Sequence, residues 1–433
     1  MVRDTTARPG TARRVGTALI VGGPLLMFAA IASERGGAPF WLQQVLAWPG
    51  FLWMAFSLYL LLALLVGEVV RPLLRRVLER RATPTVEPVG VREGAPVRAR
   101  VPDLEAQSPS RAEPSSEPSS EAEAEAEIDA AAGSETKAGA EAKPERDEKP
   151  EPAATPATGP SRRLFVSRVV GGAAAAAAVG TVGYGTYGVL RGPKVKRVTV
   201  PLAKLPRSAH GYRIAVVSDV HLGPVLGRGF AQKVVDTINS TQPDLIAVVG
   251  DLVDGSVKDL GPAAAPLAQL KARHGSFFVT GNHEYFSGAE EWVARVRELG
   301  LRPLENARTE LADFDLAGVN DVAGEDEGQG PDFVKALGDR DRSRACVLLA
   351  HQPVQIHDAV DHGVDLQLSG HTHGGQLWPG SLIADQVNPT LAGLERYGDT
   401  QLYVSRGAGA WGPPTRVGAP SDITVVELAS RQA

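Results

Sequence analysis

The chain of 433 residues is too long for one ordinary domain, and its composition changes abruptly along its length, so we expect at least three regions. Its formal net charge is −5, and no basic segment interleaved with aromatic residues is visible, which argues against nucleic-acid binding. Cys346 is the single cysteine, which excludes an intrachain disulfide. It lies in a short apolar run, so we expect its side chain to be buried.

The first region, residues 1–81, contains two apolar stretches. They extend roughly from Val15 to Ala32 and from Leu46 to Val70, and each approaches the ~20 residues that a membrane-spanning helix needs. We expect both to span a membrane; a cleaved signal peptide is the alternative for the first. Four arginines precede the first stretch and five follow the second, whereas the loop between them carries only Glu34 and Arg35. The positive-inside rule therefore places both ends in the cytoplasm and the loop outside.

The second region, residues 82–160, is rich in Ala, Glu, Pro and Ser. It has no aromatic residue, and its 17 acidic and 8 basic residues give it a net charge of −9. Such a composition cannot bury enough apolar surface to fold, so we predict a disordered acidic linker. A partner-binding role for the acidic run is the alternative.

The third region, residues 161–193, begins with SRRLFVSR and continues as an Ala- and Gly-rich run long enough to cross a membrane. It resembles a twin-arginine export signal in an internal position, or it is a third span whose arginines anchor its cytoplasmic end. Either interpretation places the following residues outside, in a multi-pass protein of the cytoplasmic (inner) membrane. The basic residues between Arg191 and Arg197 favour the opposite orientation. If this run is not a span, the last domain is cytoplasmic.

The last region, residues 194–433, alternates short β-branched runs with helical patterns such as FAQKVVDTINS, APLAQLKARH and EEWVARVRELG. This alternation predicts an α/β domain. Its later strands, near residues 314–319, 402–405 and 423–428, have no long helices between them. That spacing favours mixed sheets, and two packed sheets with helices outside would fit.

Five motifs in this region each follow a hydrophobic run that reads as a buried strand. They are SDVH, GDLVDG, GNHE, HQP and SGHTHGG. Asp219 and His221 are two residues apart, so both can reach one ion from a strand end, and His371 and His373 have the same spacing. The candidate ligands are Asp219, His221, Asp251, Asn282, His351, His371 and His373. A set of nitrogen and oxygen donors without thiolate suits Mn, Zn or Fe.

The five motifs in this order resemble the calcineurin-like metallophosphoesterase superfamily, over residues 195–428. The ending, SRGAGAWGPPTRVGAPSDITVVEL, resembles its membrane-anchored or exported bacterial branch. The resemblance implies a four-layer αββα sandwich with two divalent metal ions at the strand ends. It implies that one metal is held by Asp219, His221, Asp251 and His373, and the other by Asp251, Asn282, His351 and His371. Asp251 would bridge the two.

The resemblance also implies a reaction in which a metal-bridging hydroxide attacks the phosphoester. His283, next to a ligand, would be the general acid, and Asp254 would hydrogen-bond to it and raise its pKa. Glu284 is expected to be structural. Protein phosphatases of the superfamily carry Arg where this chain has Gly255, so we expect a phosphodiester or small phosphoester substrate instead.

An active site tethered near a bilayer suggests a lipid phosphoester, a nucleotide-linked lipid or a cell-envelope polymer as substrate. An apolar rim at Trp378, Pro379, Trp411, Pro413 and Pro414 would suit such a ligand, and loop packing is the alternative. Two other functions remain open. One is hydrolysis of a nucleotide-linked lipid A precursor of the UDP-diacylglucosamine type, and the other is a non-catalytic metal-binding membrane sensor. The sequence predicts no oligomeric state.

Overall fold

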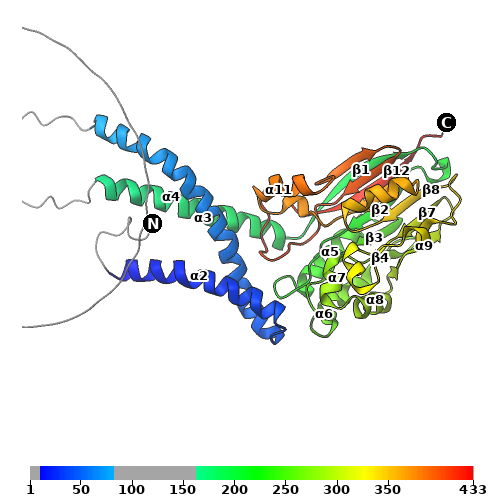
Figure 1. Cartoon of the computed structure of the whole chain (residues 1–433), viewed down its shortest axis with the longest axis horizontal. Coiled ribbons are helices and arrows are strands. Elements are labelled where there is room, and N and C mark those ends of the chain that lie inside the picture. Colours follow the sequence, from blue (N-terminus) through cyan, green and yellow to red (C-terminus); the bar gives the residue numbers. More distant parts are fainter. Residues whose placement is uncertain (1–9, 82–161, 433) are drawn as a thin grey trace, which may run out of the picture. The chain divides into compact units, whose positions relative to one another are not determined.

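The computed structural model describes residues 10–81 and 162–432 (Figure 1). The predicted disordered linker, residues 82–160, lies outside the described residues. The N-terminal helices and the C-terminal domain belong to one compact unit.

Among the described residues, three helices are long and apolar enough to cross a membrane: α2 (Thr11–Arg35), α3 (Phe40–Arg81) and α4 (Arg162–Leu190). This confirms the prediction of three apolar helices. The second is much longer than its apolar stretch, because α3 continues into the Arg-rich segment that follows and includes Pro72 within the helix. Arginine has a high helix propensity, so this segment extends the helix although it is polar.

Helix α3 packs against both of the other helices through small residues. Ala30 of α2 is buried against Ala47 and Phe51 of α3, and Ala174 and Ala178 of α4 are buried in a cluster with α3. Small side chains let helix backbones approach closely, and van der Waals packing of this kind drives helix association in a bilayer. Figure 1 shows that α2 and α4 run towards the C-terminal domain and that α3 runs away from it.

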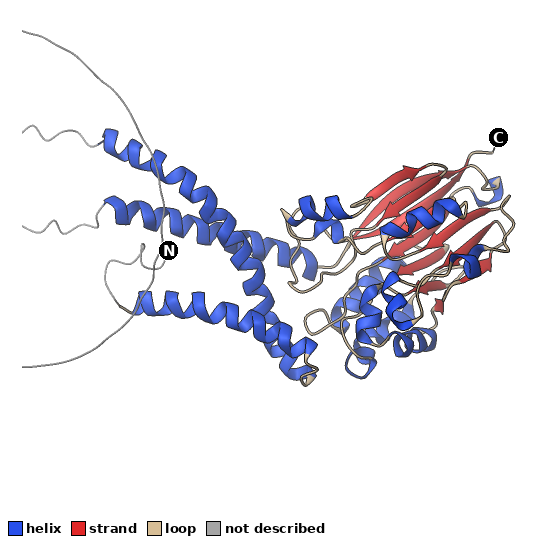
Figure 2. Ribbon diagram, in the orientation of Figure 1, coloured by secondary structure: helices blue, strands red, loops and turns tan. Residues whose placement is uncertain are grey.

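The C-terminal domain contains two six-stranded sheets (Figure 2). The first has the order β1 (Lys194–Leu202), β12 (Asp422–Ser430), β2 (Tyr212–Val217), β3 (Leu245–Val249), β4 (Ser276–Val279) and β5 (Arg302–Pro303). The second has the order β10 (Gly393–Tyr397), β11 (Thr400–Val404), β9 (Leu366–Ser369), β8 (Ala345–Leu349), β7 (Phe314–Gly318) and β6 (Ala307–Glu310). Both are mixed: β12 runs antiparallel to β2, and β6 and β10 run antiparallel to their neighbours.

Alternation along the strands explains how the layers stack. In β3, Leu245, Ala247 and Val249 belong to a core cluster that also contains residues of the second sheet, while Ile246 and Val248 pack with helices on the outer face. Because successive side chains point to opposite faces, a strand covered on both sides must be apolar throughout. The four-layer αββα fold is therefore confirmed.

Helices cover the two outer faces. The first sheet is covered by α5 (Arg228–Ser240), α6 (Val257–Ala264) and α8 (Ala289–Glu298), and the second by α9 (Phe333–Leu337) and α10 (Ile356–Asp361). The helical pattern APLAQLKARH forms only a 3-10 helix, Ala265–Gln269, after which the chain is extended at Leu270. Pro262 and Pro266 each remove a backbone donor here, which disfavours one continuous α-helix.

Candidate metal centre and catalytic site

The predicted site residues come together where strands end. Within each sheet, β2, β3 and β4 are parallel neighbours, and so are β8 and β9. Asp219, Asp251, Asn282, His351 and His371 each follow the end of one of these five strands within three residues. Parallel neighbours end at the same edge, so these side chains gather at one place.

The first donor group consists of Asp219, His221 and His373. All three residues are buried. Nε2 of His373 lies 3.4 Å from Oδ1 of Asp219 and 2.9 Å from Nε2 of His221. Burial lowers the pKa of His373, and the neighbouring His221 adds to this effect. His373 is therefore neutral, which is the form of imidazole that binds a metal ion.

The second donor group consists of Asp251, His351 and His371. Nε2 of His351 lies 3.2 Å from Oδ2 of Asp251. Asn282 joins this group, because its Oδ1 lies 3.0 Å from Nδ1 of His371. Burial and the charge of His351 lower the pKa of His371 to about 4, so this imidazole is neutral as well.

Asp251, a member of the second group, also lies close to the first. Its Oδ2 is 3.2 Å from Nε2 of His351 in the second group and 3.8 Å from Nε2 of His221 in the first. The backbone N–H of His283 donates to the other oxygen, Oδ1, at 2.9 Å. One carboxylate therefore faces both donor groups.

The donor chemistry and the orientation of His351 fit divalent cations. Nδ1 of His351 lies 2.8 Å from the carbonyl oxygen of Val249, so Nδ1–H donates to that oxygen. Nε2 is buried and makes no well-aligned hydrogen bond, although Oδ2 of Asp251 lies 3.2 Å away. A histidine whose other nitrogen is held by a carbonyl is typical of metal ligands. Burial disfavours a charged ring here, yet Asp251 and Asp219 raise its pKa, so the surroundings favour positive charge at this position.

The backbone is strained at the same residues. Asp219, His221, Asp251, His371 and His373 have φ values between 48° and 72°. They are five of the eight non-glycine residues with positive φ in the part of the chain that the structure describes. Left-handed backbone is costly for such residues and concentrates at functional sites. Local propensity does not produce these conformations, so the surrounding packing must hold them.

His283 lies beside the donor groups and pairs with Asp254. Its Nδ1 is 2.7 Å from Oδ1 of Asp254, and the same oxygen is 2.8 Å from Nδ1 of His221. Burial lowers the pKa of His283, but the hydrogen bond and charge of Asp254 outweigh it and raise the pKa to about 9. The ring is edge-on to Phe286 and Trp411, which are 75% and 57% exposed.

Glu284 is fully buried and holds the loops of the site. Its carboxylate accepts backbone N–H groups from Asp251 at 2.9 Å, Leu252 at 2.7 Å and Gly281 at 2.6 Å. Gly281 is required at its position because a Cβ there would overlap the carboxylate of Asp251. This agrees with the expected structural role of Glu284, because the carboxylate connects the GDLVDG and GNHE loops.

Arg416 supports the site and was not predicted from the sequence. This residue is only 6% exposed, and its guanidinium donates to the carbonyl oxygens of His373 at 2.9 Å and Gly409 at 2.6 Å. It thereby connects the loop of the last motif to the Pro- and Gly-rich segment near the C-terminus. The only signal for it was a single arginine within GPPTRVGAP, which predicts nothing about its partner.

Comparisons with known proteins agree with this geometry. Residues 212–375 match the family model of the calcineurin-like phosphoesterases. The chain is 38% identical over 259 residues to a transmembrane protein with metallophosphoesterase domain of Danio rerio, covering 57% of this chain and 59% of the relative. It is 40% identical over 247 residues to an uncharacterized metallophosphoesterase of Helicobacter pylori, covering 56% and 66%.

A shorter relative is matched over nearly its whole length. An uncharacterized metallophosphoesterase of Aquifex aeolicus is 35% identical over 240 residues, which cover 54% of this chain and 91% of the relative. The chain thus spans less than two thirds of the zebrafish and Helicobacter relatives but most of the Aquifex one. The chain belongs to the calcineurin-like phosphoesterase family.

Proposed function

We propose that this protein is a membrane-anchored phosphodiesterase with two divalent cations, Mn, Zn or Fe, at the carboxyl ends of the strands. The position of Asp251 between two groups of buried and half-buried donors carries the proposal. One cation would be held by Asp219, His221, Asp251 and His373, and the other by Asp251, Asn282, His351 and His371. When bound, such a pair polarises the phosphoester and makes a water molecule nucleophilic at neutral pH.

His283 is the proposed general acid. Its Nδ1–H donates to Asp254, which leaves Nε2 to deliver a proton to the departing ester oxygen. The raised pKa keeps the ring protonated at neutral pH, as this role requires. The side chain of His283 is 14% exposed and that of His221 is fully buried, so of these two partners of Asp254 only His283 is open to a substrate.

A diester is favoured over a monoester because position 255 has no guanidinium. The N–H of Gly255 donates to Oγ of Ser287, and Asp254 is already paired with two histidines. An arginine at that position would provide a bidentate grip on a phosphate dianion. A diester carries only one negative charge on its phosphate, so it loses less from the absence of this grip.

The surroundings of His283 support a substrate that is linked to a lipid or to the cell envelope. Phe286 and Trp411 present exposed aromatic surface beside the ring. Tyr59 of α3 donates to the carbonyl oxygen of Trp378 at 2.9 Å. A Cβ at Gly412, the residue after Trp411, would lie 3.5 Å from the side chain of Met54 in α3. The proposed site is therefore next to apolar helices, where a membrane-bound substrate is concentrated.

Charge near the helix ends supports an extracytoplasmic catalytic domain in the inner membrane. The Arg-rich end of α3 and the three arginines near the start of α4 lie at the ends of these helices that point away from the catalytic domain (Figure 1). By the positive-inside rule those ends face the cytoplasm. The connection between α2 and α3 and the catalytic domain then face the other side.

An assay with paired substrates tests the proposed reaction. The full chain in detergent is supplied with Mn, Zn or Fe and given an aryl phosphate diester and the monoester of the same phenol. We expect metal-dependent turnover with a higher kcat/KM for the diester. A preference for the monoester would contradict the phosphodiesterase proposal, and no turnover with two bound metals would favour the sensor alternative.

A further inference from the structure

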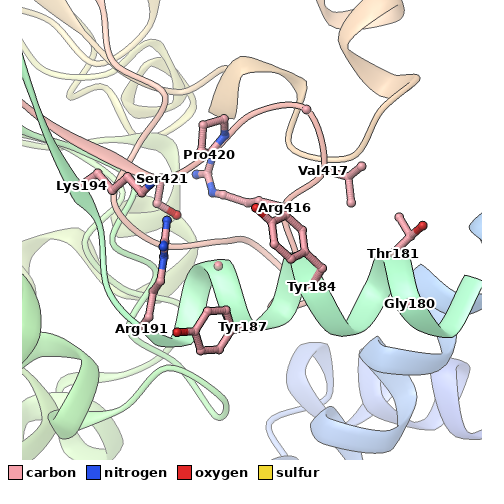
Figure 3. A pocket seen from close by; sticks show the side chains of 12 residues that line it. Gly180, Thr181, Tyr184, Tyr187, Arg191, Lys194, Arg416, Val417, Pro420 and Ser421 are labelled. Atoms are coloured by element: carbon pink, nitrogen blue, oxygen red, sulfur yellow. The ribbon is translucent and has the colours of Figure 1, made fainter.

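A cavity of about 600 Å³ lies between the end of α4 and the loop of residues 416–421 (Figure 3). Tyr184 and Tyr187 contribute from α4, Arg191 from the turn that follows it, Lys194 from the start of β1, and Arg416 and Ser421 from the other side. Figure 3 shows the side chain of Arg191 next to that of Tyr187 and directed towards Ser421. The cavity is separate from the proposed catalytic residues, none of which lines it.

The lining of the cavity is positively charged. It includes Arg191, Lys194 and Arg416 and no Asp or Glu. The nearest carboxylate in the sequence, Asp422, is buried and accepts hydrogen bonds from Thr424 and Ser405 instead. Arg191 and Lys194 are exposed. An anion that entered would therefore meet cations without a competing carboxylate in the lining.

The order of side chains along α4 and the turn that follows it corresponds to the order of groups in a phospholipid. Val179 is apolar and 61% exposed, Tyr184 and Tyr187 follow at 81% and 63%, and Arg191 and Lys194 come last. Tyrosine is enriched where the apolar core of a bilayer meets the headgroups, and basic side chains near a membrane attract anionic lipids. Acyl chain, glycerol and phosphate would meet these three levels in turn.

Glycines leave the cavity beside α4 unfilled. Gly180 and Gly188 both line the cavity, and a Cβ built at either position would meet no atom within 4 Å. In contrast, Gly185 on the same helix faces the backbone of Arg416, and the hydroxyl groups of Thr186 and Thr415 are 2.7 Å apart. Helix α4 thus contacts the catalytic domain through one face and leaves an unfilled space beside it.

We propose that this cavity binds the phosphate headgroup of an anionic membrane phospholipid, with Arg191 and Lys194 on the phosphate and the acyl chains along α4. This lipid is not the substrate of the metal centre. It fills the gap between the last membrane helix and the catalytic domain. It would also contact Arg416, whose guanidinium holds the loop of His373.

Lipid retention measured by native mass spectrometry tests the proposal. The full chain is purified in neutral detergent with equal amounts of phosphatidylglycerol and phosphatidylcholine, and bound lipids are counted for the wild type and for R191Q/K194Q. A basic residue at a lipid surface changes affinity by roughly fivefold, so the double substitution should weaken phosphatidylglycerol binding roughly 25-fold. The matched control is R197Q/R207Q, which removes two exposed cations outside the cavity and should change retention little.

A second variant tests the cavity without changing charge. Gly188→Leu places a side chain in the open space and should also reduce retention of phosphatidylglycerol. Equal retention of the two lipids by the wild type, or an equal loss in both double variants, would overturn the proposal. Inorganic phosphate that binds the lipid-free protein through Arg191 and Lys194, with no lipid retained, would identify a soluble-anion site and overturn it as well.

Discussion

Oδ1 of Asp254 lies 2.7 Å from Nδ1 of His283. The same oxygen is 2.8 Å from Nδ1 of His221, which belongs to the first donor group. A single carboxylate therefore orients both the proposed general acid and a proposed metal ligand. The neighbouring histidines lower the pKa of Asp254 to about 2, although burial alone would raise it. Asp254 in turn raises the pKa of His283.

Replacing His283 should slow the reaction without removing the metals. We expect His283→Gln to retain both metals and to slow diesters with poor leaving groups by about 10²- to 10⁴-fold, the usual contribution of general acid catalysis. Esters of acidic phenols should lose far less, because their leaving groups need no proton. The measurement is kcat across a series of phenols, with metal content determined in parallel. An equal loss across the series would remove His283 from this role.

Asp254→Asn should change the pH dependence of the reaction. The negative charge of Asp254 raises the pKa of His283, so a neutral amide lets that pKa fall. The protonated acid is then lost at a lower pH, and the alkaline decline of kcat should begin at a lower pH than in the wild type. Profiles of kcat between pH 6 and 10 measure this shift. His283→Gln is the control, because without the imidazole its profile should lack this alkaline decline. An unchanged alkaline limb in Asp254→Asn speaks against the pairing.

Asp251→Asn should remove most activity together with bound metal, because the carboxylate faces both donor groups. Metal content by plasma mass spectrometry and turnover of an aryl diester are measured on the same sample. Asp236→Asn on α5 is a suitable control, since Asp236 is exposed and lies in none of the metal-ligating groups. Retention of both metals with full turnover would refute the bridging role.

Glu284→Gln should destabilise the catalytic domain. The carboxylate accepts three backbone N–H groups, whereas an amide has one acceptor oxygen and turns its own N–H groups towards a donor. A buried unsatisfied donor costs about 1–3 kcal/mol, which corresponds to a fall in Tm of roughly 2–12 °C for a domain of this size. Thermal unfolding in detergent measures the change. Glu298→Gln, which removes an exposed ion pair with Arg295, should alter Tm much less.

The orientation can be tested with one introduced cysteine. Cys346 is fully buried, and burial raises the pKa of its thiol to about 12, so it should not react in the folded protein. Arg431→Cys provides an exposed thiol near the end of the catalytic domain. We expect a membrane-impermeant maleimide to label it in cells whose cytoplasmic membrane is intact. Labelling only after the membrane is permeabilised would place the domain in the cytoplasm.

Much of the fold is visible in the sequence because the central strands, such as β3, β8 and β9, are buried on both faces. The runs at β2, β3 and β8 are continuous and β-branched, and the motif residues follow them directly. The full length of α3 was less predictable, since its end is polar and its limits are set by helix propensity rather than by hydrophobicity. The helical pattern that begins at Ala265 did not give an α-helix. Nearby prolines disfavour one there, although the apolar residues have helical spacing.

The candidate ligands were predictable because their residue types follow strand ends, but their supports were not. Arg416 lies 43 residues from His373 in the sequence, and only the folded chain brings its guanidinium to the carbonyl oxygen of His373. The cavity beside α4 depends in the same way on a contact between Gly185 and Arg416. Contacts of this range are set by tertiary packing, which local spacing does not encode.

The most direct test of the central claim is to count metals while following turnover. The full chain is stripped with a chelator, titrated with Mn, Zn or Fe, and assayed at each step with an aryl phosphate diester. We predict that activity returns only as binding approaches two metals per chain, and that Asp251→Asn does not recover. Full activity in the stripped protein, or with one metal per chain, would contradict the dinuclear site centred on Asp251.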